Sequence, residues 1–201
     1  VLIPRPETEG LVEAALTHLR EHALTEPAIL DMGTGSGCVA LALAHERPDA
    51  RVTALDDSGA ALAVARRNAR RLGLRNVAFV QGRWFAPLGR RRFDVIVSNP
   101  PYVRSDDPHL GQGDLRFEPV AALDGGPDGL AALRELAAAA PHHLVAGGLL
   151  AVEHGCDQAQ AVVALFREAG LVDIGVQPDA AGLARIALGR RPAASGDAER
   201  G

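Results

Sequence analysis

Residues 28–37 read Ala-Ile-Leu-Asp-Met-Gly-Thr-Gly-Ser-Gly, and an Ala/Leu-rich stretch of helical character, 38–46, follows directly. The apolar run from Ala28 to Met32 is typical of a short buried strand. The glycines after it let the chain turn sharply and let a ligand approach backbone N–H groups where the helix starts. This stretch therefore predicts a strand–loop–helix unit of an α/β fold, with a ligand site at its turn.

The spacing of the glycines excludes two common phosphate-binding loops. A dinucleotide loop needs glycine where this chain has Cys38, and a Walker loop needs a Gly-Lys-Ser/Thr sequence that does not follow here. The loop instead suits a nucleoside that carries a carboxylate. Asp56 ends the next expected strand, where a carboxylate can accept hydrogen bonds from both ribose hydroxyls. Either feature alone also fits a plain strand–helix turn, but together they favour a nucleoside site.

Strand and helix patterns alternate on both sides of this unit. The chain begins with a stiff extended Pro4-Arg5-Pro6, and Ser58 and Gly73 are expected to cap a helix between them. Strands separated by helices imply a parallel sheet, whereas the last two strands, with no helix between them, predict an antiparallel edge hairpin. Beyond 28–32 and 38–46, we expect strands over 51–55, 77–80, 93–97, 148–153, 171–176 and 183–188, and helices over 7–20, 58–72, 129–143 and 158–169.

The composition is that of an ordinary globular domain. The 201 residues are 47% hydrophobic and 23% charged, and the formal charge of -4 argues against a domain built mainly to grip nucleic acid. The dense basic stretch 90–92 is interpreted as a solvated turn. Cys38 and Cys156 cannot make a disulfide framework, and we expect no metal site and a reducing, cytoplasmic location. No apolar run reaches the roughly 18 residues of a membrane span, so no membrane association is expected.

Asn99-Pro100-Pro101-Tyr102 follows the strand expected at 93–97. The two prolines remove two backbone donors and stiffen the chain, which leaves carbonyls unpaired in fixed directions. Asn99 adds a side-chain acceptor, and Tyr102 adds a flat face. If the Asn99 side-chain oxygen and the Pro100 carbonyl each accept one N–H of a planar amide or amine, the nitrogen lone pair has a fixed direction. Positive charge that develops on this nitrogen during group transfer would then be stabilised.

A rigid proline turn that merely closes a strand is the simpler interpretation of these four residues. Their position favours function, because this turn and the glycine loop both follow the carboxyl ends of strands and should share one edge of the sheet. The long polar stretch 98–128, which begins at the turn, is also expected to be functional.

Several segments together resemble the HemK-like protein-glutamine methyltransferases, which modify peptide chain release factors. Two of them carry most of the resemblance, because the glycine loop and the Asn-Pro-Pro-Tyr turn also occur in methyltransferases of nucleic-acid amines. These two are Ile3-Pro4-Arg5-Pro6-Glu7-Thr8-Glu9 and Gly113-Asp114-Leu115-Arg116-Phe117-Glu118-Pro119, and the others are the glycine loop from Asp31, Trp84-Phe85, Ser98-Asn99-Pro100-Pro101-Tyr102 and Glu153-His154-Gly155.

The resemblance implies a Rossmann-like class I methyltransferase fold: a mostly parallel central sheet, a C-terminal antiparallel edge hairpin and helices on both faces. This domain would occupy 28–190. Residues 1–27 would be a leading segment and helix that end the linker from an amino-terminal helical domain, and 191–201 would be a disordered tail.

The resemblance also implies S-adenosylmethionine as donor, S-adenosylhomocysteine as product and a release factor as partner, with the chain acting as a monomer. The methyl acceptor would be the glutamine amide nitrogen of a Gly-Gly-Gln motif, held by Asn99, Pro100, Pro101 and Tyr102. Of these, Asn99, Pro100 and Tyr102 would be catalytic. The cofactor would contact Gly33, Thr34, Gly35 and Gly37 at its methionine end, Asp56 at the ribose, Trp84 along the adenine, Asn99 at the reacting centre, and Thr8, which would close over it.

One departure from the family and two alternatives accompany this prediction. The position before Trp84 is often acidic in the family but is Arg83 here, which affects the adenine contacts. One alternative is a methyltransferase of an exocyclic base amine in DNA or rRNA, with Tyr102 stacking on a flipped base. The other is a non-catalytic S-adenosylmethionine-binding domain, although such a domain has no need of oriented carbonyls.

Overall fold

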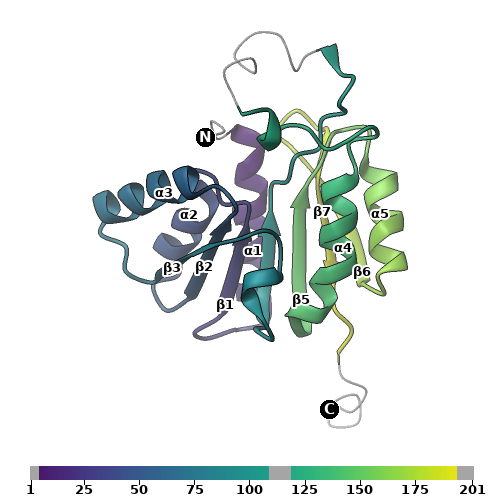
Figure 1. Ribbon diagram of the computed structural model, residues 1–201. Coiled ribbons are helices and arrows are strands. Elements are labelled where there is room, and N and C mark those ends of the chain that lie inside the picture. Colours follow the sequence, from purple (N-terminus) through teal and green to yellow (C-terminus); the bar gives the residue numbers. More distant parts are fainter. Residues whose placement is uncertain (1–4, 109–118, 194–201) are drawn as a thin grey trace, which may run out of the picture.

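The computed structural model describes residues 5–108 and 119–193, which form a seven-stranded sheet flanked by helices (Figure 1). The strands are β1 (Ala28–Met32), β2 (Arg51–Asp56), β3 (Val77–Gln81), β4 (Phe93–Ser98), β5 (Leu144–Glu153), β6 (Val172–Pro178) and β7 (Ala184–Arg190). The helices are α1 (Glu9–Glu21), α2 (Cys38–Glu46), α3 (Gly59–Leu72), α4 (Ala131–His143) and α5 (Ala159–Glu168), with 3-10 turns η1 (Pro6–Thr8), η2 (Ala86–Leu88) and η5 (Val120–Ala122).

The strand order is β3-β2-β1-β4-β5-β7-β6. The first five strands of this order are parallel to one another, whereas β7 is antiparallel to both β5 and β6. The predicted parallel sheet with an antiparallel edge hairpin is therefore confirmed. The order reverses direction between β1 and β4, and in open α/β sheets such a switch point opens a crevice beyond the carboxyl ends of the strands.

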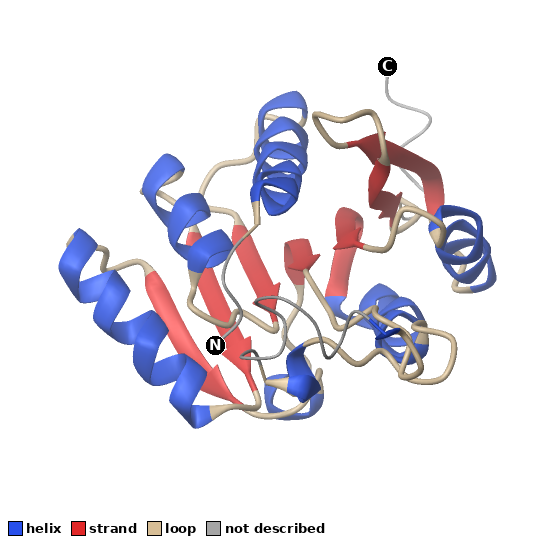
Figure 2. Cartoon of the chain, turned by 90° about the horizontal axis from the view of Figure 1, so that it is seen from above, coloured by secondary structure: helices blue, strands red, loops and turns tan. Residues whose placement is uncertain are grey.

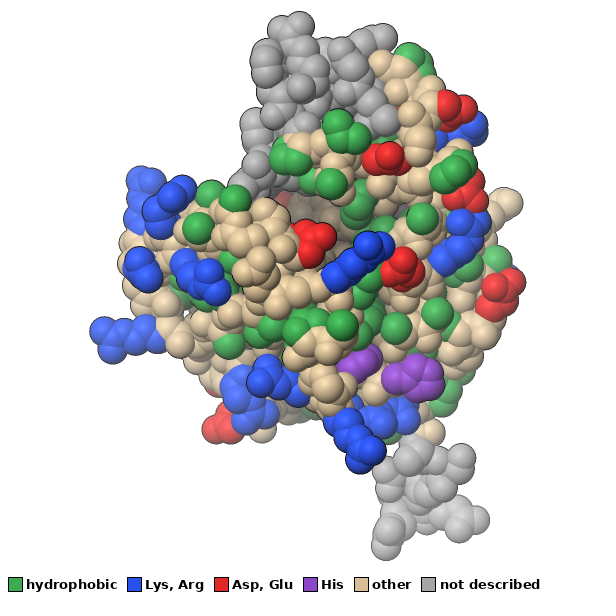
Figure 3. All heavy atoms as spheres, viewed as in Figure 1, with side chains coloured by type: hydrophobic (Ala, Val, Ile, Leu, Met, Phe, Trp, Pro, Cys, Tyr) green, Lys and Arg blue, Asp and Glu red, His purple; other side chains and the backbone are tan. Residues whose placement is uncertain are grey.

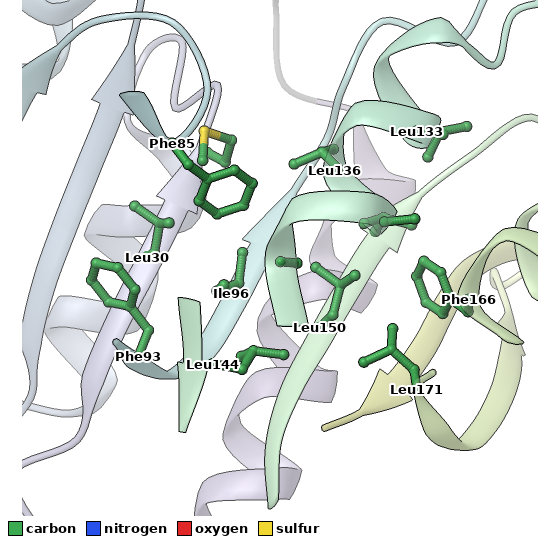
Figure 4. Close-up of a cluster of buried hydrophobic side chains, with 14 of the residues drawn as sticks. Leu30, Phe85, Phe93, Ile96, Leu133, Leu136, Leu144, Leu150, Phe166 and Leu171 are labelled. Atoms are coloured by element: carbon green, nitrogen blue, oxygen red, sulfur yellow. The ribbon is translucent and has the colours of Figure 1, made fainter. Parts of the chain in front are cut away.

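Two apolar cores lie on the two faces of the sheet. Helices α1 and α2 bury their leucines and alanines on one face, and α4 and α5 cover the other (Figure 2). On the second face, Leu30, Ile96 and Leu150 of three adjacent strands point toward Leu133 and Leu136 of α4 (Figure 4). The prediction of helices on both faces is confirmed. The sheet edge at which the crevice opens is therefore flanked on each side by a layer of packed helices.

Most of the predicted element boundaries agree with the structure within two residues. Ser58 caps α3 by accepting a hydrogen bond from the Ala61 N–H at 3.2 Å, and Gly73 ends this helix with a φ of 72°. At the amino end, η1 replaces the start of the helix that we expected from residue 7.

The start of β5 was predicted wrongly. The strand begins at Leu144, directly after α4, rather than at 148, because Gly147 and Gly148 form an irregularity inside the strand and do not mark a turn before it. The pairing of β4 with β5 shifts register between Phe93 and Val95 to accommodate the extra residues, and Gly147 adopts a φ of 77°. A bulge is the physical reason, since it lets two glycines stay in a continuous strand.

Candidate active site

A cavity of about 840 Å³ lies beyond the carboxyl ends of β1, β2 and β4. The space-filling view shows a hollow in the surface at the carboxyl end of the sheet (Figure 3). The volume of the cavity is in the range that small-molecule sites occupy. Nine of the predicted site residues line it: Thr8, Gly33, Thr34, Gly35, Asp56, Trp84, Asn99, Pro100 and Pro101.

The remaining two predicted site residues, Gly37 and Tyr102, are not among the lining residues. Gly37 is the left-handed N-cap of α2, and a Cβ there would approach the Ala65 side chain to 3.0 Å. Tyr102 does not line the cavity, and its ring does not cover it. Its hydroxyl donates a hydrogen bond to the buried carboxylate of Glu153. Both residues therefore lie next to the cavity lining without being part of it.

The glycine loop is pinned to the end of β2 by backbone hydrogen bonds. The N–H groups of Gly33 and Thr34 both donate to the Leu55 carbonyl, at 2.8 and 2.9 Å. The Gly35 N–H donates to one oxygen of the Asp56 carboxylate at 2.8 Å, and the Ser58 N–H donates to the other at 2.9 Å. Each carboxylate oxygen keeps a second lone pair, so Asp56 can still accept hydrogen bonds from ligand hydroxyls.

Asp31 is a buried acid in the cavity wall that the sequence prediction did not assign to the site. One oxygen of its carboxyl group accepts from the Thr34 hydroxyl at 2.6 Å and from the Ala40 N–H at 3.0 Å. Burial raises the pKa of Asp31 to about 6, with a smaller contribution from the charge of Asp56. A lone acid in an otherwise apolar strand, just before the glycines, is the signal that could have identified it.

Trp84 adopts a left-handed backbone conformation, with a φ of 48°, and its side chain is partly buried against the apolar core. Its indole N–H is buried and has no hydrogen-bond partner among the described residues. An unsatisfied buried donor that lines a cavity is a candidate ligand contact. Beside it, Arg83 forms a 3.6 Å ion pair with Glu135 of α4, and both side chains are at least half exposed.

A chain of hydrogen bonds runs beneath the Asn-Pro-Pro-Tyr turn. The Asn99 side-chain NH₂ donates to the Thr8 hydroxyl at 3.1 Å, and this hydroxyl donates to one Glu153 oxygen at 2.8 Å. The Tyr102 hydroxyl donates to the other Glu153 oxygen at 2.9 Å. Among the described residues nothing donates to the Asn99 side-chain oxygen or to the Pro100 carbonyl, so both acceptors remain available at the cavity.

Glu153 is the principal site residue whose role the sequence prediction missed. It ends β5 and is 1% exposed. Burial raises the pKa of its carboxyl, while the hydrogen bonds from Thr8 and Tyr102 act in the opposite direction. Burial and the neighbouring Glu153 raise the pKa of Tyr102 as well, so its phenol is neutral near neutral pH. The only sequence signal is a glutamate that directly follows an apolar strand.

The second half of the long loop returns to the turn. Val103 forms an isolated bridge with Asp124, and the Gln158 side chain donates to the Tyr102 carbonyl at 3.0 Å and to the Gly129 carbonyl at 3.3 Å. Residues 119–122 then line one side of the cavity. Of the segment 113–119 that supports the resemblance, only Pro119 lies within the described residues.

Two other expectations concern absences. Over residues 5–108 and 119–193, no cluster of His, Cys, Asp and Glu could hold a metal ion. Within the same ranges no helix is long and apolar enough to cross a membrane.

Comparisons with known proteins show similarity to methyltransferases. The Methyltransferase small domain family matches residues 12–112. The chain is 56% identical over 191 residues to the release factor glutamine methyltransferase of Xylella fastidiosa (strain Temecula1), covering 95% of this chain and 69% of that protein. It is 53% identical over 190 residues to the protein of the same name from Bordetella pertussis, with shares of 94% and 69%.

A solved structure extends the similarity to three dimensions. The release-factor-specific protein-(glutamine-N5) methyltransferase of Alicyclobacillus acidocaldarius superposes with a TM-score of 0.59 at 31% identity, covering 94% of each chain. The sequence and structure comparisons thus each cover more than nine tenths of the chain. The chain belongs to the family of release factor glutamine methyltransferases.

Proposed function

We propose that this chain transfers a methyl group from S-adenosylmethionine to the glutamine amide nitrogen of a Gly-Gly-Gln motif in a peptide chain release factor. The observation that carries the proposal is the pair of acceptors in two cavity-lining residues, the Asn99 side-chain oxygen and the Pro100 carbonyl, to which no residue of 5–108 and 119–193 donates. A primary amide has two N–H donors, so it can satisfy both acceptors at once.

The cavity residues fit S-adenosylmethionine as donor. The left-handed Gly33 and Gly35 leave room for close approach at the amino end of the loop, and Asp56 keeps acceptor capacity for ribose hydroxyls. The unpartnered Trp84 N–H is a donor at the side of the cavity where we place the adenine. When bound, S-adenosylmethionine supplies an electrophilic methyl group on a sulfonium centre.

The protein's contribution at the acceptor is orientation and charge stabilisation. With its two N–H groups held by Asn99 and Pro100, the substrate nitrogen cannot rotate, and its lone pair keeps one direction. Both acceptors then stabilise the positive charge that develops on nitrogen as it is alkylated. The alkylated nitrogen loses a proton readily, so this mechanism requires no strong base from the protein.

The neighbouring residues are consistent with a mechanism that uses no general base. His154 is fully buried, burial lowers its pKa, and its Nδ1 contacts the Gly155 carbonyl at 2.8 Å. We assign it no catalytic role.

A substrate that works with ribosomes also implies a cytoplasmic reaction. We retain as a proposal the additional amino-terminal helical domain that helps to dock the release factor.

The direct test is to incubate the protein with tritiated S-adenosylmethionine and either a release factor or nucleic acid. We expect label in the release factor and, by mass spectrometry, one added methyl on its Gly-Gly-Gln peptide. Label found only in nucleic acid would refute the proposal and support the base-amine alternative. Donor binding without transfer to either substrate would support a non-catalytic domain.

A further inference from the structure

The carboxylate of Glu153 contacts both ends of the Asn-Pro-Pro-Tyr turn. It accepts the Tyr102 hydroxyl directly at 2.9 Å, and it reaches Asn99 through the Thr8 hydroxyl, with bonds of 2.8 and 3.1 Å. Thr8 ends η1, before α1, while the other partners belong to β5 and to the turn that follows β4. Three distant segments of the chain therefore meet at one buried acid.

The Glu153 carboxylate fixes where the hydroxyl protons point, because one of its oxygens accepts from Thr8 and the other from Tyr102. A carboxylate only accepts hydrogen bonds, so the protons of Thr8 and Tyr102 must both be directed at Glu153. The Thr8 hydroxyl has a single proton, and after donating it can offer only lone pairs to its other neighbour. The group that faces Thr8 from Asn99 must therefore be a donor.

This requirement selects one of the two orientations of the Asn99 amide. The NH₂ and C=O groups of an asparagine have nearly the same shape, so packing alone distinguishes them poorly. Here the NH₂ group faces Thr8, and an oxygen in its place would meet the lone pairs of the hydroxyl. The amide oxygen is thereby left as the free acceptor.

We propose that Glu153 is a positioning residue which, through the Thr8 hydroxyl, holds the Asn99 amide with its oxygen toward the substrate. The inference rests on the proposed function, since the free oxygen is useful only for a substrate that donates an N–H. Thr8 thus acts in positioning Asn99, in addition to lining the cavity. Without the carboxylate, the Thr8 proton would turn to Asn99 and would bind its oxygen.

The test replaces the carboxylate by an apolar side chain of similar length, Glu153→Met. Methionine fills a similar space and removes both acceptor oxygens, so the Thr8 and Tyr102 hydroxyls lose their acceptor. In this variant the Thr8 hydroxyl can donate its proton to the Asn99 oxygen, so the amide turns over and presents NH₂ to the substrate. We expect kcat to fall about 100-fold, as when one stabilising group is lost from an active site, with the S-adenosylmethionine Kd unchanged. The matched control is Glu168→Gln at an exposed position of α5, which should keep the wild-type kcat.

A second substitution separates orientation from a general structural role. Asn99→Asp has acceptor oxygens on both sides, so in the double variant Glu153→Met/Asn99→Asp one oxygen takes the Thr8 proton and the other faces the substrate. We expect the double variant to be about tenfold faster than Glu153→Met alone. Simple damage to the site would make the double variant slower.

Should Glu153→Met fail to fold, Thr8→Val and Thr8→Ser provide the same test, because Thr8 is the middle member of the hydrogen-bond chain from Glu153 to Asn99. Valine keeps the shape and removes the hydroxyl, so kcat should fall at least about tenfold, and serine should recover most of this loss. A wild-type protein that does not methylate the release factor would refute the proposed function. If the wild type is active, the positioning role is overturned by a folded Glu153→Met within about twofold of its kcat, by a double variant no faster than the single one, or by a Thr8→Val variant that keeps full kcat.

Discussion

The Gly35 N–H donates a 2.8 Å hydrogen bond to the Asp56 carboxylate, which joins the middle of the glycine loop to the end of β2. Two parts of the cavity wall that are separate in the sequence are thus built as one unit. The shape of the loop depends on Asp56, which we also propose to bind the ribose of the donor. A change at Asp56 should therefore affect both the loop conformation and ribose binding.

The first prediction concerns donor binding by Asp56→Asn. The new side chain places an NH₂ group against either the Gly35 or the Ser58 N–H, and it has fewer lone pairs for the ribose hydroxyls. Since a hydrogen bond to a charged group contributes more than a neutral one, we expect the Kd for S-adenosylmethionine to rise roughly 10- to 100-fold. Isothermal titration calorimetry measures it. Asp173→Asn, at an exposed residue of β6, is the matched control, and an Asp56→Asn protein with wild-type affinity would contradict the assignment.

The second prediction concerns Asn99→Ala, which removes the acceptor at the substrate nitrogen but leaves the glycine loop intact. We expect kcat to fall by about 100-fold or more, because the lost contact stabilises charge that forms only during transfer. The S-adenosylmethionine Kd should change only a few-fold. Steady-state kinetics with a release factor, combined with calorimetry, separates the two effects. Turnover that survives this substitution would exclude the role given to Asn99.

The third prediction concerns stability and uses two glycines with the same φ of 72°. A Cβ on Gly129 would lie against the Tyr102 carbonyl oxygen and 2.5 Å from the Gln158 side-chain nitrogen, whereas a Cβ on Gly73 would meet nothing within 4 Å. Gly73→Ala should therefore cost only the backbone strain, about 1–2 kcal/mol. Gly129→Ala should lower the free energy of unfolding by roughly 2 kcal/mol more, because it also displaces the Gln158 contacts. Urea unfolding of both variants gives the difference in the free energy of unfolding. Equal losses of stability would show that the backbone around Gly129 shifts to accommodate the added methyl group.

The fourth prediction concerns pH and Asp31. Its pKa of about 6 in the folded protein lies above the ordinary value of 3.8, so between these values only the unfolded chain loses the proton. The associated stability is complete below about pH 4 and is lost as pH rises through 6, by roughly 3 kcal/mol in total. Asp31→Asn imitates the protonated acid, because an amide oxygen can accept from both Thr34 and Ala40.

The measurement for Asp31 is the free energy of unfolding of both proteins at pH 4 and pH 7.5. Other titrating groups affect both proteins alike, so the comparison isolates this carboxyl. The stability of Asp31→Asn relative to the wild type should increase with pH. A difference that stays constant between the two pH values would mean that Asp31 is ionised in the folded protein throughout this range.

The fold could be predicted from sequence because its signals are local. The run Ala28–Met32 is apolar except for Asp31, and the glycines after it leave few other conformations for the turn. The Ser58 and Gly73 caps also depend on neighbours within one helical turn. The start of β5 at Leu144 was missed because a bulge opposite Phe93 depends on the partner strand, which local patterns do not report.

The site was predictable only in part for a related reason. Asp56 ends β2 and Asn99 directly follows β4, so topology alone brings them to one edge of the sheet. The contact between Thr8 and Glu153 spans 145 positions of the chain and depends on how η1 is held against β5. No spacing rule predicts such a contact, and for that reason Glu153 received no role from sequence.

The position of β7 between β5 and β6 also has a consequence for biosynthesis. During translation β5 and β6 leave the ribosome first, but β7, which pairs with both of them, emerges only with residues 184–190. Until then β5 presents an open edge with unpaired N–H and C=O groups, which is a template for aggregation. The nascent chain must therefore keep one edge of β5 unpaired until β7 emerges, while β4 pairs with the other edge, and a chain truncated before Ala184 would be prone to associate through β5.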